Sequence, residues 1–307
     1  MLQLLVLPMR TRALISTLIG AVSGFYCWFL LSRLHLGAAD FDSAIRAARA
    51  LLAHQNPYSA KLQLYPVPAA FFGFPFVAFP PPVSAAVFYG TSSALLAFGL
   101  TRFGYTRLLI FLAYPYWAGL LTAQWSPLLM AGALFPLAMF AVLAKPQIGL
   151  PMLLSHPSKK GGAVCLLAAI LSFIVMPAWP KYWFAQLGRY DHFFPILIFP
   201  GFLLVLTLSR YRDPDSLLLF FMACTPQRWF YDAFVLWLLP KSRREILSTV
   251  IISWGAGIWR WYHTPRTFHQ VGLWTVLFLY LPMLVVILLR IRGGRSLPVP
   301  ASTGHIL

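Results

Sequence analysis

Apolar runs long enough to cross a membrane recur along the whole chain. The clearest cover residues 13–31, 82–100, 162–177 and 272–289, and clusters of basic residues lie between them. Since about 20 apolar residues make one helical crossing of the hydrocarbon core, each run is a candidate transmembrane helix. The pattern predicts an all-α, polytopic integral membrane protein, with residues 1–307 forming a single transmembrane domain.

The basic clusters set the expected orientation of these runs. There are six of them: Arg10/Arg12, Arg102/Arg107, Lys159/Lys160, Arg210/Arg212, Lys241/Arg243/Arg244 and Arg290/Arg292/Arg295. Loops rich in Lys and Arg stay on the cytoplasmic side, so the chain must cross an even number of times between successive clusters. We expect about ten to twelve transmembrane helices, with the N- and C-termini cytoplasmic.

Composition and charge agree with this picture. Hydrophobic residues make up 60% of the chain and charged residues 10%, whereas a soluble domain carries roughly 25% charged residues. The net charge of +17 would suit nucleic-acid binding in a soluble protein. In a membrane protein, cytoplasmic loops that face anionic lipid account for it. Membrane lipids are therefore expected partners, and nucleic acid is not.

Prolines interrupt the apolar sequence between residues 107 and 159. They divide it into four short runs, several of them too short to span alone, at Pro115, Pro127, Pro136 and Pro146. Irregular backbone at membrane depth must be shielded from lipid, so such pieces are expected to line a cavity. Four crossings here place Lys145 near the outer face, whereas two crossings would place it deeper.

The segment after the first predicted helix, residues 33–81, is expected to form a long outer loop. Asp40 is well placed to cap a helix, with Asp42 in its first turn. Alternatively, a carboxylate there can act as a general base, because a hydroxyl acceptor must lose a proton to become a good nucleophile. Residues 69–79, rich in aromatics and proline, predict an interfacial or re-entrant helix, with an ordinary amphipathic connector as the alternative.

Several short motifs follow one another along the chain: Asp40-Phe41, a small-residue helix at 47–52, Asn56-Pro57-Tyr58, Tyr65 to Pro68, Gln124-Trp125-Ser126, Lys145-Pro146-Gln147, Thr225-Pro226 and Tyr231-Asp232. In these motifs and their order the chain resembles glycosyltransferase family 87, polytopic enzymes of the C-type glycosyltransferase superfamily that use a polyprenyl-phosphate sugar. The chain departs from the family at His54, where glycine is usual, at Val67, where proline is common, and in the turn at Gln124, where only the glutamine matches.

The resemblance implies a C-type glycosyltransferase fold, with Asp40 as the catalytic base and Asp42 as second candidate. Lys145 and Gln147 would bind the donor phosphate, and the charge of Arg228 makes it a further candidate. The alternatives are a snorkelling lysine at a helix end and an arginine in an interfacial aromatic belt. Expected contacts with sugar or acceptor are Gln124, Tyr58, Tyr231 and Asp232. A lipid-phosphate donor needs no metal or other cofactor.

These features predict an inverting glycosyltransferase of the cell membrane that acts at the outer face. Its donor would be a polyprenyl-phosphate sugar, with mannose implied by the resemblance alone, and its acceptor a glycolipid or glycan. A transporter or lipid-sugar flippase also suits broken helices and a lysine at membrane depth. A catalytically silent lipid-binding partner in envelope assembly is a third alternative. An outer carboxylate beside the first helix favours the transferase, because a transporter does not need one.

Overall fold

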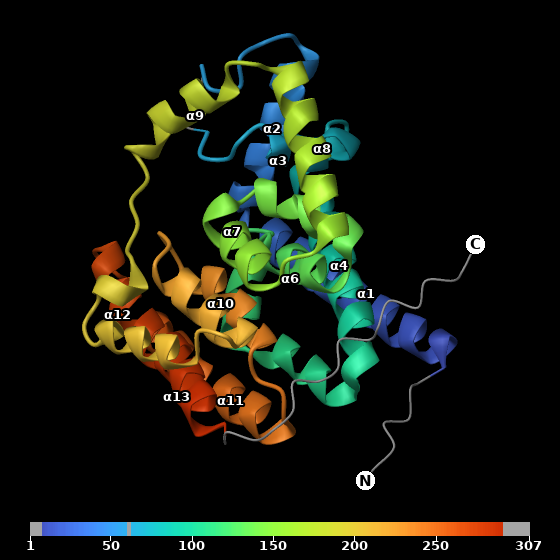
Figure 1. Cartoon of the computed structure of the whole chain (residues 1–307). Helices are drawn as coiled ribbons and strands as arrows, with labels where there is room; N and C mark the ends of the chain where they lie inside the picture. Colours follow the sequence, from blue (N-terminus) through green and yellow to red (C-terminus); the bar gives the residue numbers. More distant parts are fainter. Residues whose placement is uncertain (1–7, 60–62, 291–307) are drawn as a thin grey trace.

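The computed structural model describes residues 8–59 and 63–290 and is built from helices joined by loops (Figure 1). Within these residues the only extended pairing is an isolated antiparallel bridge between Phe193 and Gln227. The all-α class is therefore confirmed. The α-helices are α1 (Met9–Leu34), α2 (Ala39–Leu52), α3 (Pro68–Gly73), α4 (Pro81–Leu100), α5 (Tyr114–Leu120), α6 (Ser126–Leu134), α7 (Pro146–Ser155), α8 (Lys159–Val175), α9 (Trp179–Leu187), α10 (Pro214–Ala223), α11 (Arg243–Tyr262), α12 (Phe268–Thr275) and α13 (Leu281–Leu289).

Tighter or wider helical turns connect many of these helices. A π-helix, η8 (Val276–Tyr280), joins α12 to α13 into one continuous rod. The other connectors are 3₁₀ helices: η1 (Phe74–Phe76), η2 (Thr101–Phe103), η3 (Tyr105–Leu112), η4 (Pro136–Leu143), η5 (Pro195–Leu197), η6 (Gly201–Arg210) and η7 (Phe230–Leu238).

The breaks predicted from proline between residues 107 and 159 are confirmed. Each of the four prolines lies in the first turn of a separate helix, where its missing N–H costs nothing and its fixed φ fits. These helices are α5 for Pro115, α6 for Pro127, η4 for Pro136 and α7 for Pro146. The segment is therefore a series of four short pieces that pack against one another.

Three of the described helical segments are long and apolar enough to cross a bilayer: Met9–Leu34, Pro81–Phe103 and Phe268–Leu289. A fourth is present if α8 and α9, bent by 99° at their junction, count as one span. Their outer faces carry exposed apolar side chains, such as Leu18 (62% exposed) on α1 and Ile174 (71%) on α8. Soluble proteins rarely expose contiguous apolar surface of this kind. These segments indicate a membrane protein.

Basic residues gather at one end of the helices. Members of four of the basic clusters are joined there by hydrogen bonds and ion pairs: Arg12 to Thr101, Arg107 to the carbonyl of Pro240, and Lys241 and Arg290 to Asp215. Arg292, Arg295 and both chain ends, which were predicted to be cytoplasmic, lie outside the described residues. Because α1 has 26 residues, a length of about 39 Å, the segment that follows it begins far from Arg12.

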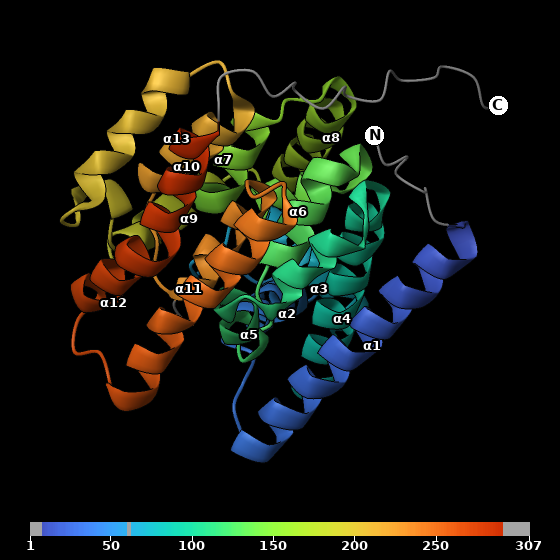
Figure 2. The ribbon, with the colours of Figure 1, turned by 90° about the horizontal axis from the view of Figure 1, so that it is seen from below.

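Helices α1 and α4 lie side by side, as two views show (Figures 1 and 2). Glycines at the contact allow this approach. A Cβ atom added at Gly20 of α1 would lie 2.7 Å from the carbonyl oxygen of Gly90 and 2.7 Å from the Cβ of Ala94, both on α4. At Gly24 it would lie 2.9 Å from the carbonyl oxygen of Ala86. Small residues commonly let helix backbones approach closely in membranes.

We expect Gly20→Leu to force α1 away from α4 and to lower stability by about 2 kcal/mol, because the added side chain meets backbone atoms that cannot move aside. The matched control is Gly162→Leu on α8, where an added Cβ has no heavy atom within 4 Å. The measurement is the thermal unfolding midpoint of purified protein in detergent. Equal midpoints for the two variants would contradict the close α1–α4 contact.

Candidate active site

Helix α2 carries Asp40 into the centre of the molecule. The helix begins at Ala39, its N-cap is Ala38, and no side-chain capping hydrogen bond forms there. The predicted capping role of Asp40 is therefore wrong, because Asp40 lies inside the first turn. The next residue, Phe41, is fully buried and stacks on Phe88 of α4 with 3.9 Å between ring centroids. This stacking fixes the start of α2 and the direction of the Asp40 side chain.

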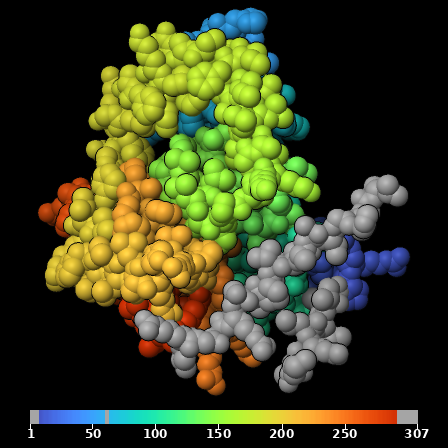
Figure 3. All heavy atoms as spheres, viewed as in Figure 1, coloured from blue at the N-terminus to red at the C-terminus, as the bar shows by residue number. Residues whose placement is uncertain are grey.

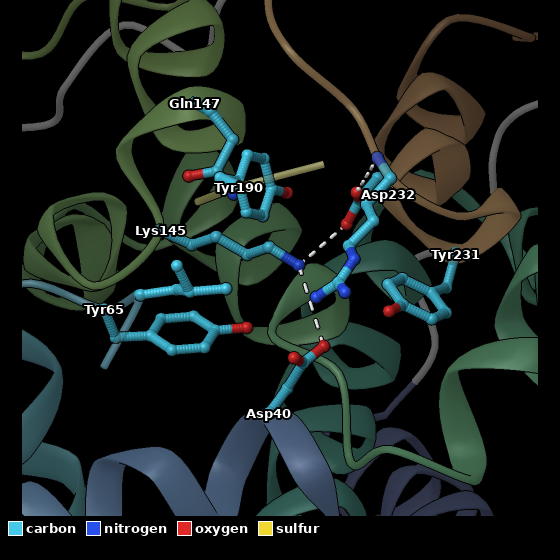
Figure 4. A pocket seen from close by; sticks show the side chains of 9 residues that line it. Asp40, Tyr65, Lys145, Gln147, Tyr190, Tyr231 and Asp232 are labelled. Atoms are coloured by element: carbon cyan, nitrogen blue, oxygen red, sulfur yellow. Dashed lines mark hydrogen bonds and ion pairs between the residues drawn. The ribbon is translucent and has the colours of Figure 1, made fainter. Parts of the chain in front are cut away.

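Lys145 is the residue before α7, at the break that Pro146 creates. Its side chain is only 4% exposed. The Nζ atom donates to Asp232 Oδ1 at 2.7 Å and lies 4.0 Å from Asp40 Oδ2 (Figure 4). It also donates to Gln124 Oε1 at 2.7 Å. A buried ammonium group needs such partners, since losing water without compensation is costly.

Asp232 lies in the first turn of η7 and is fully buried. One carboxylate oxygen accepts from Lys145, and the other accepts from the backbone N–H of Arg228 at 3.1 Å. Gln124 reaches Lys145 from the turn between α5 and α6, where Ala123 adopts a left-handed φ of 48°. Four segments distant in sequence therefore meet at one lysine.

A small cavity lies among these groups, with a volume of about 20 Å³. That is room for about one water molecule. A phosphate or a sugar would therefore require lining side chains to move. The lining residues are Asp40, Leu64, Tyr65, Lys145, Gln147, Tyr190, Arg228, Tyr231 and Asp232.

Arg228 brings a second cation to the cavity. Its guanidinium lies 5.7 Å from the ring centroid of Tyr190 and 5.1 Å from that of Phe268. Its Nε atom is buried and has no hydrogen-bond partner in the part of the chain that the structure describes. With both carboxylates ionised, two cations and two anions line the cavity, and a donor group of Arg228 is still free to bind an anion.

The carboxylate of Asp40 is set up to accept a proton. Its side chain is 19% exposed, and Oδ2 is buried without a hydrogen-bond partner among the described residues. Burial raises the pKa of Asp40 above its ordinary value, and the neighbouring charge of Lys145 partly offsets this rise. A smaller opposing effect on the pKa comes from the hydroxyl of Tyr65, which points toward the carboxylate in Figure 4.

Six of the nine residues expected at the site line the cavity: Asp40, Lys145, Gln147, Arg228, Tyr231 and Asp232. Gln124 is not in the lining, and it accepts a hydrogen bond from Lys145 Nζ. Tyr58 lies outside and donates from its hydroxyl to the carbonyl of Tyr65 at 3.2 Å. Asp42 is not in the lining, because two helical steps of about 100° turn it away from Asp40.

Leu64, Tyr65 and Tyr190 complete the lining, and the site residues expected from sequence did not include them. Leu64 is held by α9, whose Trp183 donates from Nε1 to the carbonyl of Leu64 at 2.9 Å, and Tyr65 is held by the hydroxyl of Tyr58. Tyr190 follows α9 and is positioned by the bridge between Phe193 and Gln227. A contact between segments so far apart in the chain cannot be predicted from the local sequence. Figure 3 shows α8 and α9 at the top of the molecule, on its surface.

His54 follows the end of α2 and adopts a φ of 54°, in the left-handed region that glycine takes without strain.

Comparison of the chain with models of protein families, with curated proteins and with solved structures finds no match. The resemblance to family 87 therefore rests on the motifs, and the function rests on the arrangement of the residues.

We expect Lys145→Met to destabilise the protein by about 3–5 kcal/mol, because it leaves the buried Asp232 carboxylate without its partner. The double variant Lys145→Met/Asp232→Asn should recover part of that loss, which gives a favourable coupling in a double-mutant cycle. Lys181→Met, at an exposed position of α9, is the control and should unfold like the wild type. Additive effects of the two single substitutions on thermal unfolding would contradict the ion pair.

Proposed function

We propose that the chain is an inverting membrane glycosyltransferase with the fold of the C-type superfamily and about ten to twelve transmembrane helices. It would transfer a sugar, mannose by resemblance, from a polyprenyl-phosphate donor to a glycolipid or glycan acceptor. The reaction would take place at the outer face of the cell membrane, with both chain ends cytoplasmic. One observation carries the proposal: the Asp40 carboxylate lies 4.0 Å from the Lys145 ammonium in a cavity that Arg228 also lines.

The proposed step is a single displacement at the anomeric carbon. The acceptor hydroxyl gives its proton to Asp40, and its oxygen forms a bond to the anomeric carbon. The bond between that carbon and the phosphate oxygen breaks, and polyprenyl phosphate leaves as a monoester with the bonding electron pair. One base and one displacement imply inversion. The raised pKa of Asp40 favours proton uptake at this stage.

The two cations match the charge that develops on the leaving phosphate. Lys145 has three N–H donors, and two of them are used at 2.7 Å by Asp232 and Gln124. The third donor and the free Nε of Arg228 are available to phosphate oxygens. Fixed donors aimed at developing charge lower a barrier without reorganisation at the moment of reaction. Asp232 then serves to hold Lys145 in place.

The apolar surface of α8 fits a donor with a long lipid tail. Leu167 and Ile174 are 57% and 71% exposed on this helix, and α9 continues from it to Leu64 at the cavity. A tail lying along α8 would bring the attached phosphate toward the cavity from the lipid side.

A lipid-sugar flippase is the second candidate, because a buried lysine between two carboxylates at a helix break also suits transporters. The two candidates differ in what they need from Asp40, since only transfer requires a base.

Purified protein supplied with radiolabelled polyprenyl-phosphate mannose and candidate acceptors tests the transferase. We expect Asp40→Asn to lower transfer by about 10²–10⁴-fold, as loss of a general base does, and Asp42→Asn to retain activity. Burial makes ionised Asp40 unfavourable for folding, so Asp40→Asn should unfold at or above the wild-type temperature.

Equal transfer by the wild type and Asp40→Asn would remove Asp40 from the mechanism. No transfer to any acceptor, together with movement of the lipid-linked sugar across liposome membranes, would favour the flippase.

The pH dependence of transfer tests the environment of Asp40. The rate should rise with pH as Asp40 loses its proton, at a pH above the ordinary aspartate value of about 3.9. Tyr65→Phe removes a hydroxyl that stabilises the carboxylate, so it should raise the pKa of Asp40 further and shift the acidic limb to higher pH. A limb that stays in place or moves to lower pH would refute this role of Tyr65.

A further inference from the structure

A second cavity opens beside the first and has a volume of about 400 Å³. Its lining comes from two segments that the charge pattern places on the outer side, one after α9 and one at the start of α12. Small-molecule sites commonly fall in a range of roughly 300–1,000 Å³. The lining residues are Asp191, His192, Arg266, Thr267, Phe268 and His269.

The two cavities share a wall. Tyr190 lines the small cavity, and the next two residues, Asp191 and His192, line the large one. On the other side of the wall, Phe268 lines the large cavity and its ring contacts the guanidinium of Arg228, which lines the small one. The wall therefore consists of Tyr190, Arg228 and Phe268, and a ligand in the large cavity would lie next to the reaction centre.

Both rims of the large cavity are fixed. The bridge at Phe193 and Gln227 holds one rim, and the His192 ring stacks on Tyr190 with centroids 5.6 Å apart. On the other rim, Thr267 caps α12 by accepting from the backbone N–H of Gln270 at 3.3 Å. The side chain of Gln270 in turn accepts from the backbone N–H of Arg266 at 2.8 Å. The backbone that carries the polar side chains of the lining is therefore fixed by hydrogen bonds on both rims.

The two cavities differ in size and can therefore hold different parts of the acceptor. The small cavity, about 20 Å³, has space only near the reacting atoms. The large cavity has about 400 Å³ and can hold a further sugar unit of the acceptor. The reacting hydroxyl would then reach Asp40 past the wall, while the rest of the glycan stays in the large cavity.

The chemistry of the lining fits a neutral saccharide. Asp191 accepts hydrogen bonds, Arg266 donates them, and the two histidine rings do either, so neighbouring hydroxyls of a sugar find partners of both kinds. One carboxylate and one guanidinium give no excess charge that would select an anion. Phe268 adds apolar surface to the lining, which the C–H groups of a sugar ring can contact.

We propose that this cavity is an acceptor subsite that binds a neutral sugar unit next to the one that receives the transferred residue. The proposal rests on the proposed function and names the chemical class of its second substrate.

Direct binding tests the subsite without requiring transfer. Saturation-transfer NMR is measured with a panel of neutral di- and tetrasaccharides, using protein purified in a detergent that contains no sugar. We expect at least one oligosaccharide to bind to the wild type and to Asp40→Asn. Binding should weaken at least tenfold in Arg266→Gln and in Asp191→Asn. The matched control is Arg189→Gln, which removes the same charge from an exposed position beside the wall and should bind like the wild type.

Thermal unfolding confirms that each variant is folded, and Arg266 and Asp191 are both exposed. Binding of none of the oligosaccharides by the wild type, or equal binding by the wild type, Arg266→Gln and Asp191→Asn, would overturn the subsite.

Kinetics separate this inference from the proposed function. With an acceptor of two or more sugar units, Arg266→Gln should raise the acceptor KM about tenfold, which corresponds to about 1.4 kcal/mol, and leave kcat and the donor KM unchanged. With a single-sugar acceptor it should behave like the wild type. Transfer by the wild type with an unchanged acceptor KM in Arg266→Gln would overturn the subsite and leave the transferase standing. Binding that depends on Arg266, without any transfer, would support the subsite and reject the transferase.

Discussion

A buried lysine ammonium organises the centre of this protein. Lys145 is almost entirely shielded from solvent, and an unpaired charge there would cost several kcal/mol. Two hydrogen bonds of 2.7 Å, to Asp232 and Gln124, offset that cost, and Asp40 adds a second negative charge at 4.0 Å. These partners come from η7, from the turn before α6 and from α2. The packing that brings these partners to Lys145 is therefore the same packing that forms the cavity.

The rest of the architecture makes that convergence possible. The glycine contact between α1 and α4 supports the packing of α2 on α4 through Phe41 and Phe88. Pro146 starts α7 with Lys145 as its N-cap residue, so the Lys145 carbonyl accepts from the backbone N–H groups of Ile148 and Gly149 while its side chain turns inward. Ion pairs at the basic end, around Asp215, hold the other ends of η7 and α13. The chemistry of the site and the stability of the fold thus depend on the same contacts.

Much of this arrangement follows from local sequence signals. Apolar runs gave the helical membrane class, and prolines marked the four breaks, because both effects act over a few residues. The place of Asp40, in the segment directly after the first predicted helix, indicated a candidate general base. Other features depend on contacts between distant segments, such as the pairing of Phe193 with Gln227 that brings Tyr190 to the cavity. The capping expectation for Asp40 failed by two residues, since the N-cap of α2 is Ala38, because helix ends are set by tertiary packing as well as by capping preference.

Asp232 shows most clearly what sequence could and could not provide. Its motif indicated a site residue, and its expected role was contact with the sugar or the acceptor. The structure gives it the side chain of Lys145 and the backbone N–H of Arg228. Hydrophobicity also left the number of crossings open. Segments such as η4 and η6 are 3₁₀ helices of 8 and 10 residues, and apolar composition alone does not set their pitch or direction.

The central claim is that the cavity around Lys145 binds a lipid phosphate. A cryo-electron microscopy structure of the protein with bound polyprenyl phosphate measures this most directly. We expect phosphate oxygens at a hydrogen-bond distance of about 3 Å from Lys145 Nζ and from the Arg228 guanidinium, with the bond from Lys145 to Asp232 retained. A phosphate bound away from both cations, for example among the basic residues near Arg12, would contradict it.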